Sequence, residues 1–166
     1  MTLIKIGKIV NTHGIKGELR LLSKFPYKDK VFINNMTIYI DKKDKEIINT
    51  YRKHKNFDMI TLKDYNNINE VLKYKGKNVY VNDSDIKLDN NKYLDEELIG
   101  LNVIYEDNNK GTIVDIERYD KTVLFNIKNN DKEYLIPYND NIIVRHSERG
   151  HNLISRGRAV GSSSGS

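Results

Sequence analysis

Cysteine and tryptophan are absent from the 166-residue sequence, and proline occurs only twice. Without cysteine the chain cannot form disulfides, cysteine-ligated metal sites or a thiolate nucleophile, which fits a reducing compartment. The sequence also lacks any run of about 18 apolar residues that could cross a membrane. Its first ten residues place lysines inside the apolar stretch, unlike a signal peptide. We therefore expect a cytoplasmic protein with no membrane partner.

Several catalytic motifs are missing as well. The sequence contains no G-x-x-x-x-G-K-[ST] loop, no G-x-G-x-x-G turn and no H-E-x-x-H. The four histidines do not have the spacing of metal ligands: His13, His54, His146 and His151. A hydrolase that uses His13 would need a nucleophile and an orienting partner, and neither is identifiable. We expect no metal, no cofactor and no enzymatic activity.

Charge is distributed unevenly along the chain. Residues 1–85 carry 17 Lys and Arg against 10 Asp and Glu, whereas residues 86–144 carry 7 against 12. Such asymmetry indicates two modules with partners of opposite charge, a polyanion for the first and a basic protein for the second. The alternative is that lysine-rich surfaces only keep the protein in solution.

Short β-branched and aromatic runs between polar turns dominate the first 82 residues and predict strands. One helix interrupts them, because Asn67 and Glu70 have capping-box spacing and Gly76 is placed to end it. The predicted strands are residues 4–10, 19–22, 36–40, one beginning near 47, 57–62 and 78–81. Six strands and one helix predict a small closed barrel over residues 1–82.

The second half follows a polar stretch rich in turn formers, residues 83–92, which we interpret as a linker. Residues 93–144 predict a second all-β module. Its expected elements are a helical turn at 95–100 and strands at 101–105, 111–117, 122–127, 134–136 and 142–144. Apolar periodicity stops at Arg145, so residues 145–166 are predicted to be a flexible or cloning-derived tail. The fold class is all-β, with two small barrels joined by a short linker.

The most distinctive stretch is IGKIVNTHGIKGELRL, residues 6–21. A strand runs into a tight connection and returns as a second strand. Gly14 and Gly17 permit positive φ there, while Lys16 and Arg20 place cations near the loop. Spacing alone favours an ordinary glycine-rich hairpin with solvated charges.

This stretch closely resembles the N-terminal signature of the RimM family of bacterial ribosome maturation factors: I-G-K-I-V, then H-G-x-x-G, then E-L-R. The likeness covers about residues 3 to 144. Weaker landmarks follow in the family's order at residues 66–81, 98–101, 111–116 and 135–137. The resemblance implies a translation-factor-like six-stranded barrel followed by a PRC-type barrel.

The resemblance also implies a function without catalysis. Such proteins bind the immature small (30S) ribosomal subunit and assist maturation of its head and processing of 16S rRNA. The implied partners are 16S rRNA of the head and a basic head protein, and we expect a monomer. The alternative is a barrel that binds another RNA, such as tRNA, with no role in assembly.

The candidate RNA-binding residues are Lys8, His13, Lys16 and Arg20 near the first loop, with Arg52, Lys53 and Lys55 as a second basic cluster.

The second module departs from the family pattern in two places. Members usually open it with adjacent tyrosines tied to ribosome binding, whereas this sequence has Lys92-Tyr93-Leu94, so only Tyr93 is carried over. A tyrosine packed at the domain junction is the alternative. The family's barrel also continues with a further strand where the tail begins here, so the second barrel is expected to be incomplete. The candidate protein-partner residues are Tyr93, Leu94, Asp95, Glu96 and Glu97.

Overall fold

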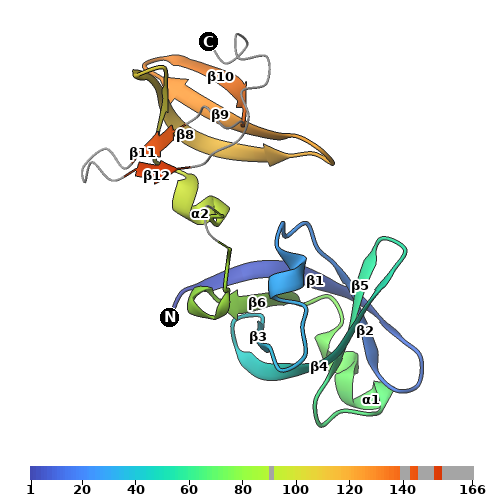
Figure 1. Ribbon diagram of the computed structural model, residues 1–166. Helices are drawn as coiled ribbons and strands as arrows, with labels where there is room; N and C mark the ends of the chain where they lie inside the picture. Colours follow the sequence, from blue (N-terminus) through green and yellow to red (C-terminus); the bar gives the residue numbers. More distant parts are fainter. Residues whose placement is uncertain (90–91, 139–142, 146–151, 155–166) are drawn as a thin grey trace. The chain divides into compact units, whose positions relative to one another are not determined.

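The computed structural model of the chain describes residues 1–89, 92–138, 143–145 and 152–154 (Figure 1). The chain divides into two compact units, Met1–Leu88 and Asp89–Ser166. This division falls inside the stretch that the sequence analysis interprets as a linker. Each unit is rich in strands, and each is described separately below.

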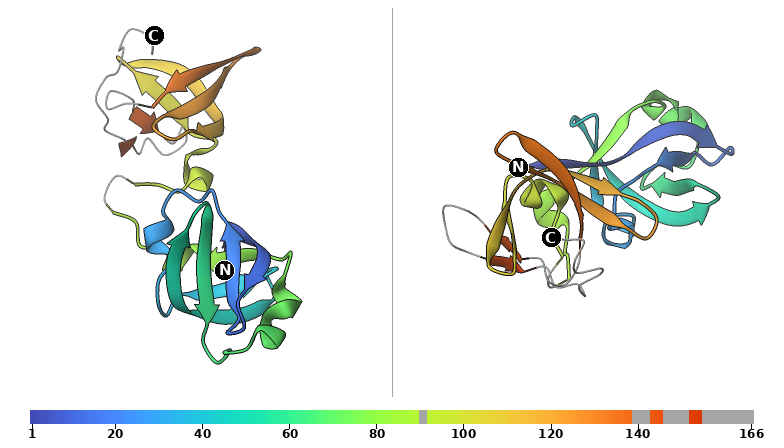
Figure 2. Two further views of the ribbon diagram at one scale, coloured as in Figure 1. Left: turned by 90° about the vertical axis from the view of Figure 1, so that its right-hand side faces the viewer. Right: turned by 90° about the horizontal axis from the view of Figure 1, so that it is seen from above.

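The first unit is a closed six-stranded barrel, as predicted. Its strand order around the ring is β1-β2-β5-β4-β3-β6, and every neighbouring pair is antiparallel. Figure 2 shows these strands from two further sides. The strands are β1 (Leu3–His13), β2 (Glu18–Leu22), β3 (Thr37–Ile40), β4 (Asp44–His54), β5 (Phe57–Leu62) and β6 (Asn78–Asn82).

Alternating apolar side chains fill the interior of this barrel. Ile4, Leu21, Ile38 and Val79 are buried, as the two-residue period of a strand requires for the inward face. Burial of branched aliphatic side chains from every strand removes a large apolar area from water and is the main stabilising term of the unit. The outward positions are therefore free to carry polar and charged residues.

A short helix lies between β5 and β6. The α-helix α1 spans Ile68–Val71 and continues as the 3-10 helix η2, Leu72–Tyr74. Asn67 caps it, since its side-chain oxygen accepts a hydrogen bond of 2.8 Å from the backbone N–H of Asn69. The helix begins where predicted, but its second half has 3-10 geometry. A further 3-10 helix in the first unit, η1, spans Lys28–Lys30.

The end of the first unit differs from the prediction. Residues assigned to the linker form the 3-10 helix η3 (Asp83–Asp85), and the backbone N–H of Asp83 donates to the carbonyl of Thr2 at 2.9 Å. Ile86 is buried. Polar composition suggested a linker, yet a single buried isoleucine and backbone hydrogen bonds attach this segment to the first unit.

The second unit is also built mainly of strands. The helix α2 (Asp95–Leu98) precedes a sheet with the order β10-β9-β8-β7-β11-β12. The strands are β7 (Asn102–Tyr105), β8 (Asn108–Arg118), β9 (Val123–Asn129), β10 (Lys132–Pro137), β11 (Ile143–Arg145) and β12 (Asn152–Ile154). In the described part of the chain, β10 and β12 are the two edges of this sheet. Leu98, Val103, Ile113, Phe125 and Ile127 belong to its apolar core.

The strand β12 lies within the segment that the sequence analysis excluded as a tail. It pairs with β11 through Val144 opposite Leu153, and Arg145 of the predicted tail is the last residue of β11. The exclusion is therefore wrong for residues 145 and 152–154. Three residues are too few to show a two-residue period, which explains why the pattern was missed. The rest of the predicted tail, residues 146–151 and 155–166, lies outside the described residues.

The backbones of β8 and β9 approach each other closely at Gly111. Gly111 has a φ of +128°, and a Cβ atom there would lie 2.5 Å from the carbonyl oxygen of Lys128 and 2.7 Å from the Ile127 Cγ2 atom. Only glycine fits both this φ and this distance. The core of the second unit therefore depends on the absence of a side chain at this position.

Candidate nucleic-acid interface

The outer face of the first barrel gathers cationic side chains from neighbouring strands. Arg20 on β2 is opposite Met59 on β5, and Met59 is opposite Arg52 on β4. Arg20 lies between the buried residues Leu19 and Leu21, so its side chain points to the outside of the ring. Arg52 points the same way, since paired residues of antiparallel strands share a face. His13 at the end of β1 is opposite Glu18 and joins the same face.

The loop between β1 and β2 is attached to α1. The backbone N–H of Ile68 donates to the carbonyl of Ile15 at 2.9 Å. Gly17 has a φ of +83°, and a Cβ there would lie 3.0 Å from the carbonyl oxygen of Asn67. This close approach explains the second glycine of the His-Gly-x-x-Gly stretch. Lys16 is held at the exposed tip of the loop.

Arg20 is the centre of the cationic face. Its Nη2 atom lies 2.9 Å from Nδ1 of His13, and its Cζ atom lies 4.9 Å from the centroid of the Phe57 ring. An arginine can only donate, so Nδ1 of His13 accepts and carries no proton in this arrangement. The Nε atom of Arg20 is buried and has no hydrogen-bond partner among the described residues.

Glu18 and Arg52 form a bidentate ion pair beside Arg20. The Nε and Nη2 atoms of Arg52 donate to the two carboxylate oxygens of Glu18 at 2.8 Å and 2.7 Å. This hydrogen-bonded arginine lowers the pKa of Glu18, and the carboxylate in turn raises the pKa of Arg52. Both groups therefore stay charged at neutral pH, and Glu18 offsets part of the positive charge of the face.

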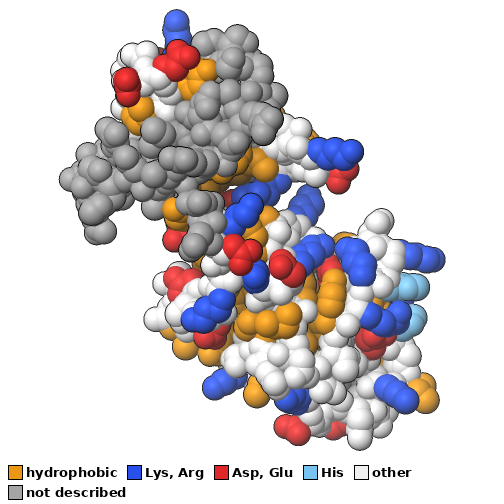
Figure 3. Space-filling view, in the orientation of Figure 1, with side chains coloured by type: hydrophobic (Ala, Val, Ile, Leu, Met, Phe, Trp, Pro, Cys, Tyr) orange, Lys and Arg blue, Asp and Glu red, His pale blue; other side chains and the backbone are white. Residues whose placement is uncertain are grey.

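His54, at the end of β4, completes the cluster. The centroids of its ring and of the His13 ring are 6.2 Å apart, with an interplanar angle of 35°. Partial burial, followed by the positive charges of Arg52 and Lys55, lowers the pKa of His54. Figure 3 shows histidine side chains flanked by lysine and arginine on one edge of the first unit. We call the set His13, Glu18, Arg20, Arg52, His54 and Phe57 the cationic face.

The structure brings together only some of the predicted RNA-binding residues. His13, Arg20 and Arg52 lie in the cationic face, and Lys55 lies in the adjoining turn between β4 and β5. Lys8 is exposed on β1, opposite Leu22. Lys53 follows Arg52 but pairs with Asp58, its Nζ atom lying 3.7 Å from Oδ1. Successive strand residues point to opposite sides, so Arg52 and Lys53 do not form one cluster.

Sequence reasoning missed Glu18, His54 and Phe57. Each is close in sequence to a predicted residue, and strand alternation would have placed His54 beside Arg52 on the outer face. Phe57 was assigned to a strand but given no role. The neighbourhood of His54 and His13 could not be found from the sequence, because it joins residues 41 positions apart.

Asp58 was also missed, and it is the buried charged residue of this barrel. Lys28 donates to it at 2.8 Å and the Tyr51 hydroxyl at 2.6 Å. Burial, followed by the hydrogen bond to Asp58, raises the pKa of Tyr51 to about 12. The Tyr51 ring stacks on Phe32 at 5.6 Å between centroids. The network connects β4, β5 and η1, and we assign it a structural role.

In the second unit, the predicted protein-partner residues serve partly to hold α2. Tyr93 is half-buried and packs against the apolar core, and Leu94 is buried. Because its side chain is not at the surface, the prediction that Leu94 contacts a partner protein is wrong. Asp95 forms an ion pair with Arg118, whose Nε atom lies 3.2 Å from Oδ2. Glu97 accepts a hydrogen bond of 2.8 Å from the backbone N–H of Leu94, which satisfies one of the free donors at the helix start. Glu96 is exposed.

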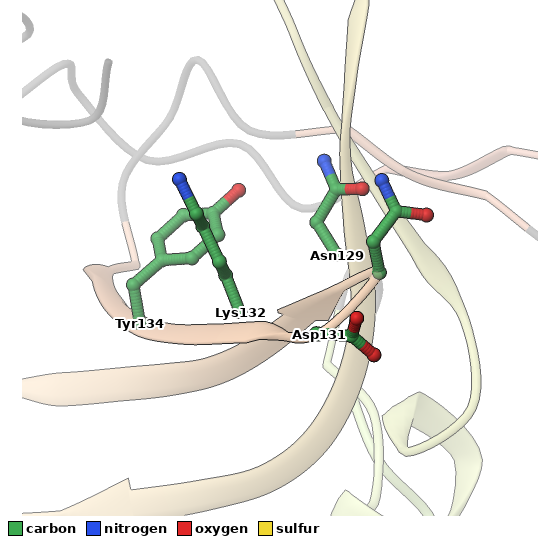
Figure 4. A pocket seen from close by; sticks show the side chains of 5 residues that line it. Asn129, Asp131, Lys132 and Tyr134 are labelled. Atoms are coloured by element: carbon green, nitrogen blue, oxygen red, sulfur yellow. The ribbon is translucent and has the colours of Figure 1, made fainter.

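A cavity of about 370 Å³ lies at the β9–β10 hairpin and is shown in Figure 4. Its lining residues are Asn129, Asn130, Asp131, Lys132 and Tyr134. Within the described ranges, this hairpin included, no three histidine, aspartate or glutamate side chains are grouped so that they could hold a metal ion. No helix in these ranges is both long and apolar enough to cross a membrane.

The fold and this surface define a two-unit β protein whose first unit is a closed barrel with a cationic and aromatic outer face. The family model of the RimM N-terminal domain matches residues 4–86. A ribosome maturation factor RimM from Bacillus mycoides is 36% identical over 148 residues, covering 84% of this chain and 86% of the relative. One from Shouchella clausii is 34% identical over 146 residues, covering 83% and 84%. The chain therefore belongs to the RimM family of ribosome maturation factors. The family is non-enzymatic, which confirms the expectation of a protein without catalytic activity.

Two solved structures were also matched. A RimM 16S ribosomal RNA processing protein from Pseudomonas aeruginosa is 25% identical and aligns over 82% of this chain and 86% of its own, with a TM-score of 0.46. The N-terminal domain of RimM from Thermus thermophilus is 18% identical and covers 53% of this chain and 98% of that domain, with a TM-score of 0.47. The family assignment rests on the sequence matches.

Proposed function

We propose that this protein binds the immature small ribosomal subunit and assists maturation of its head and processing of 16S rRNA. The observation that supports this most strongly is the cationic face, present on the barrel of a RimM-family chain. The related Pseudomonas aeruginosa protein is described as a 16S ribosomal RNA processing protein. The protein acts in the cytoplasm, as a monomer, and it works by binding alone.

The cationic face suits RNA for two physical reasons. Guanidinium groups donate to phosphate oxygens in a planar fork, and neutralising phosphates releases counterions from the RNA. Phe57 supplies an aromatic surface beside Arg20, and aromatic rings and guanidinium planes are the groups on which unpaired RNA bases stack. Lys16 on the loop tip and Lys55 in the turn between β4 and β5 are exposed and add positive charge to the surface of the same unit.

The second unit is proposed to contact a basic protein of the subunit head. Its sequence carries the acidic excess, and Glu96 is exposed on α2. Tyr93 and the adjacent carboxylates Asp95 and Glu97 form the remaining candidate surface. Charges at the rim of an interface act mainly on the rate of association, so Glu96 is expected to influence the on-rate more than the final affinity.

Sedimentation in sucrose gradients tests the proposal directly. The full chain is mixed with immature small subunits, with mature small subunits, with complete ribosomes and with tRNA. We expect co-sedimentation with the immature small subunits and weak binding to the rest, because an assembly factor must release its mature product. Equal affinity for tRNA and for immature subunits would contradict the assembly role and favour the alternative RNA-binding function.

A pair of variants tests the second unit. Tyr93→Ala is expected to weaken binding to the immature subunit about tenfold, whereas Tyr93→Phe retains the ring and binds as the parent does. Thermal unfolding of both variants is the control, since Tyr93 packs against the core. The Tyr93→Ala variant could be less stable and yet, at a temperature where it is folded, bind the subunit as tightly as the parent does. That result would assign Tyr93 a structural role only.

A further inference from the structure

Two imidazoles and one guanidinium meet on the cationic face. His13 comes from the end of β1, Arg20 from β2 and His54 from the end of β4. The two rings are 6.2 Å apart, and Arg20 joins them through its 2.9 Å contact with Nδ1 of His13. Three basic side chains from three strands therefore lie close together on the surface.

The hydrogen bonding at this point is incomplete. The guanidinium of Arg20 has five N–H groups. Nη2 contacts the imidazole, while the buried Nε has no partner in the described part of the chain. A neutral imidazole nitrogen is also a weaker partner for a guanidinium than an oxyanion, because hydrogen bonds between two charged groups are the stronger ones. Because Nε is closed off from solvent in the free protein, an anion can accept from Nε and Nη2 together only when the neighbouring side chains move aside.

The other charged groups around the imidazoles do not titrate near neutral pH. Glu18 on β2 stays ionised because its hydrogen bonds to Arg52 lower its pKa. The hydrogen bond to Glu18 raises the pKa of Arg52, which therefore stays positive. Arg20 and Lys55 of the adjoining turn are the other basic side chains near the imidazoles. Phe57 on β5 is uncharged. Histidine is the side-chain type whose charge ordinarily changes between about pH 5 and pH 8, and two histidines meet at this point.

We propose that His13, Arg20 and His54 form a subsite for one RNA phosphate, which enters by replacing the hydrogen bond between Arg20 and His13. The subsite rests on the proposed function, since the phosphate belongs to the bound RNA. Arg20 then donates to two phosphate oxygens, and each imidazole donates to the phosphate once it has taken up a proton. Binding and proton uptake are thus linked, and RNA affinity rises as the pH falls.

The size of the effect follows from this linkage. A nearby phosphate favours the charged imidazole and raises its pKa, which opposes the effect of the surrounding cations in the free protein. A rise of one pKa unit in one histidine corresponds to about a tenfold gain in affinity. We therefore expect affinity for RNA to increase about tenfold or more between pH 8 and pH 5.5.

The first arm of the test measures affinity for precursor 16S rRNA at constant ionic strength between pH 5.5 and pH 8. The variants are His13→Gln, His54→Gln and both together, and Lys16→Gln is the matched control. The double variant is expected to lose the rise with falling pH to within about twofold. Lys16→Gln is expected to lower affinity by a similar factor at each pH, because a lysine does not titrate in this range.

The second arm omits RNA and follows the imidazole resonances of the full chain by NMR during pH titration. Sodium sulfate is the probe, because its charge is constant in this range, and sodium chloride of equal ionic strength is the control. Sulfate is expected to raise the pKa of both His13 and His54 in the parent protein and of neither ring in Arg20→Gln.

Three results would overturn the subsite. If the parent protein binds RNA with the same affinity at every pH, the subsite is wrong while the proposed function stands. If the double histidine variant keeps the full pH dependence, the linkage lies elsewhere. If RNA does not bind at any pH, the proposed function and the RNA subsite both fail, whatever sulfate does in the second arm.

Discussion

The two units of this protein use their charged residues differently. On the first barrel, Arg20 and His13 meet on the outer face, and Arg20 keeps a donor without a protein partner among the described residues. On the second unit, Asp95 pairs with Arg118 and Glu97 caps α2. The net charge of a segment thus indicates the kind of partner to expect, but the structure decides which charged side chains are available to that partner.

The largest effect is expected from Gly111→Ala, which should damage the second unit alone. The new Cβ would collide with the carbonyl of Lys128 at a strained φ, so we expect a loss of about 3 kcal/mol in the free energy of unfolding of that unit. Urea unfolding followed by NMR signals from each unit measures this. Gly100→Ala is the control for the strain of a positive φ without a collision, since Gly100 has a φ of +95° and no atom lies within 4 Å of its Cβ position. Equal losses in both units would show that they unfold together.

The complementary change in the first unit is Asp58→Asn. It leaves Lys28 without its buried carboxylate and weakens the hydrogen bond from Tyr51, so the barrel should lose about 2 kcal/mol of stability. Lys53→Gln is the matched control, because its ion pair with Asp58 is longer and its side chain is half exposed, and it should cost less than about 1 kcal/mol. A neutral Asp58→Asn variant would contradict a stabilising role for this network.

The Tyr51 hydroxyl is expected to make the stability of the first unit depend on alkaline pH. Its pKa is about 12 in the folded protein and near 10 when unfolded, so its contribution is complete below pH 10. It is lost as the pH rises through 12. Tyr51→Phe should lower stability by about 1 kcal/mol at pH 7, and the gap to the parent should close between pH 10 and pH 12. A constant gap would contradict the assigned cause.

The smallest expected effect concerns RNA binding, and it compares the removal of one carboxylate from each unit. Glu18→Gln removes the one carboxylate of the cationic face and releases Arg52, so affinity for precursor 16S rRNA should rise about threefold at low salt. Glu96→Gln in the second unit is the matched control and should leave affinity for RNA unchanged. If both variants behave alike, the cationic face has no special role.

Much of the fold could be predicted from the sequence. Strand alternation and turn residues correctly predicted the six strands of the first barrel, and Asn67 correctly marked the start of its helix. The prediction was wrong at residues 83–86 and 152–154. There, a few residues are attached by backbone hydrogen bonds or a single buried side chain, and no periodic pattern develops in so short a segment.

Less of the candidate site could be predicted. The sequence identified His13, Arg20 and Arg52 through a motif and a run of charges, but it grouped Lys53 with Arg52 although strand geometry separates them. Leu94 was chosen for its position beside Tyr93 and is buried. The contact of His13 with His54 depends on how the ends of β1 and β4 approach each other in three dimensions, which no local pattern records.

The most direct test of the account is the salt dependence of affinity for precursor 16S rRNA. We predict a steep linear fall of log affinity with log salt, with a slope that becomes shallower by about 2 when Lys16 and Arg20 are both replaced by Gln. Lys121→Gln, an exposed cation of the second unit, should leave the slope unchanged. An identical slope for the parent and the Lys16→Gln, Arg20→Gln protein would contradict RNA binding by the cationic face.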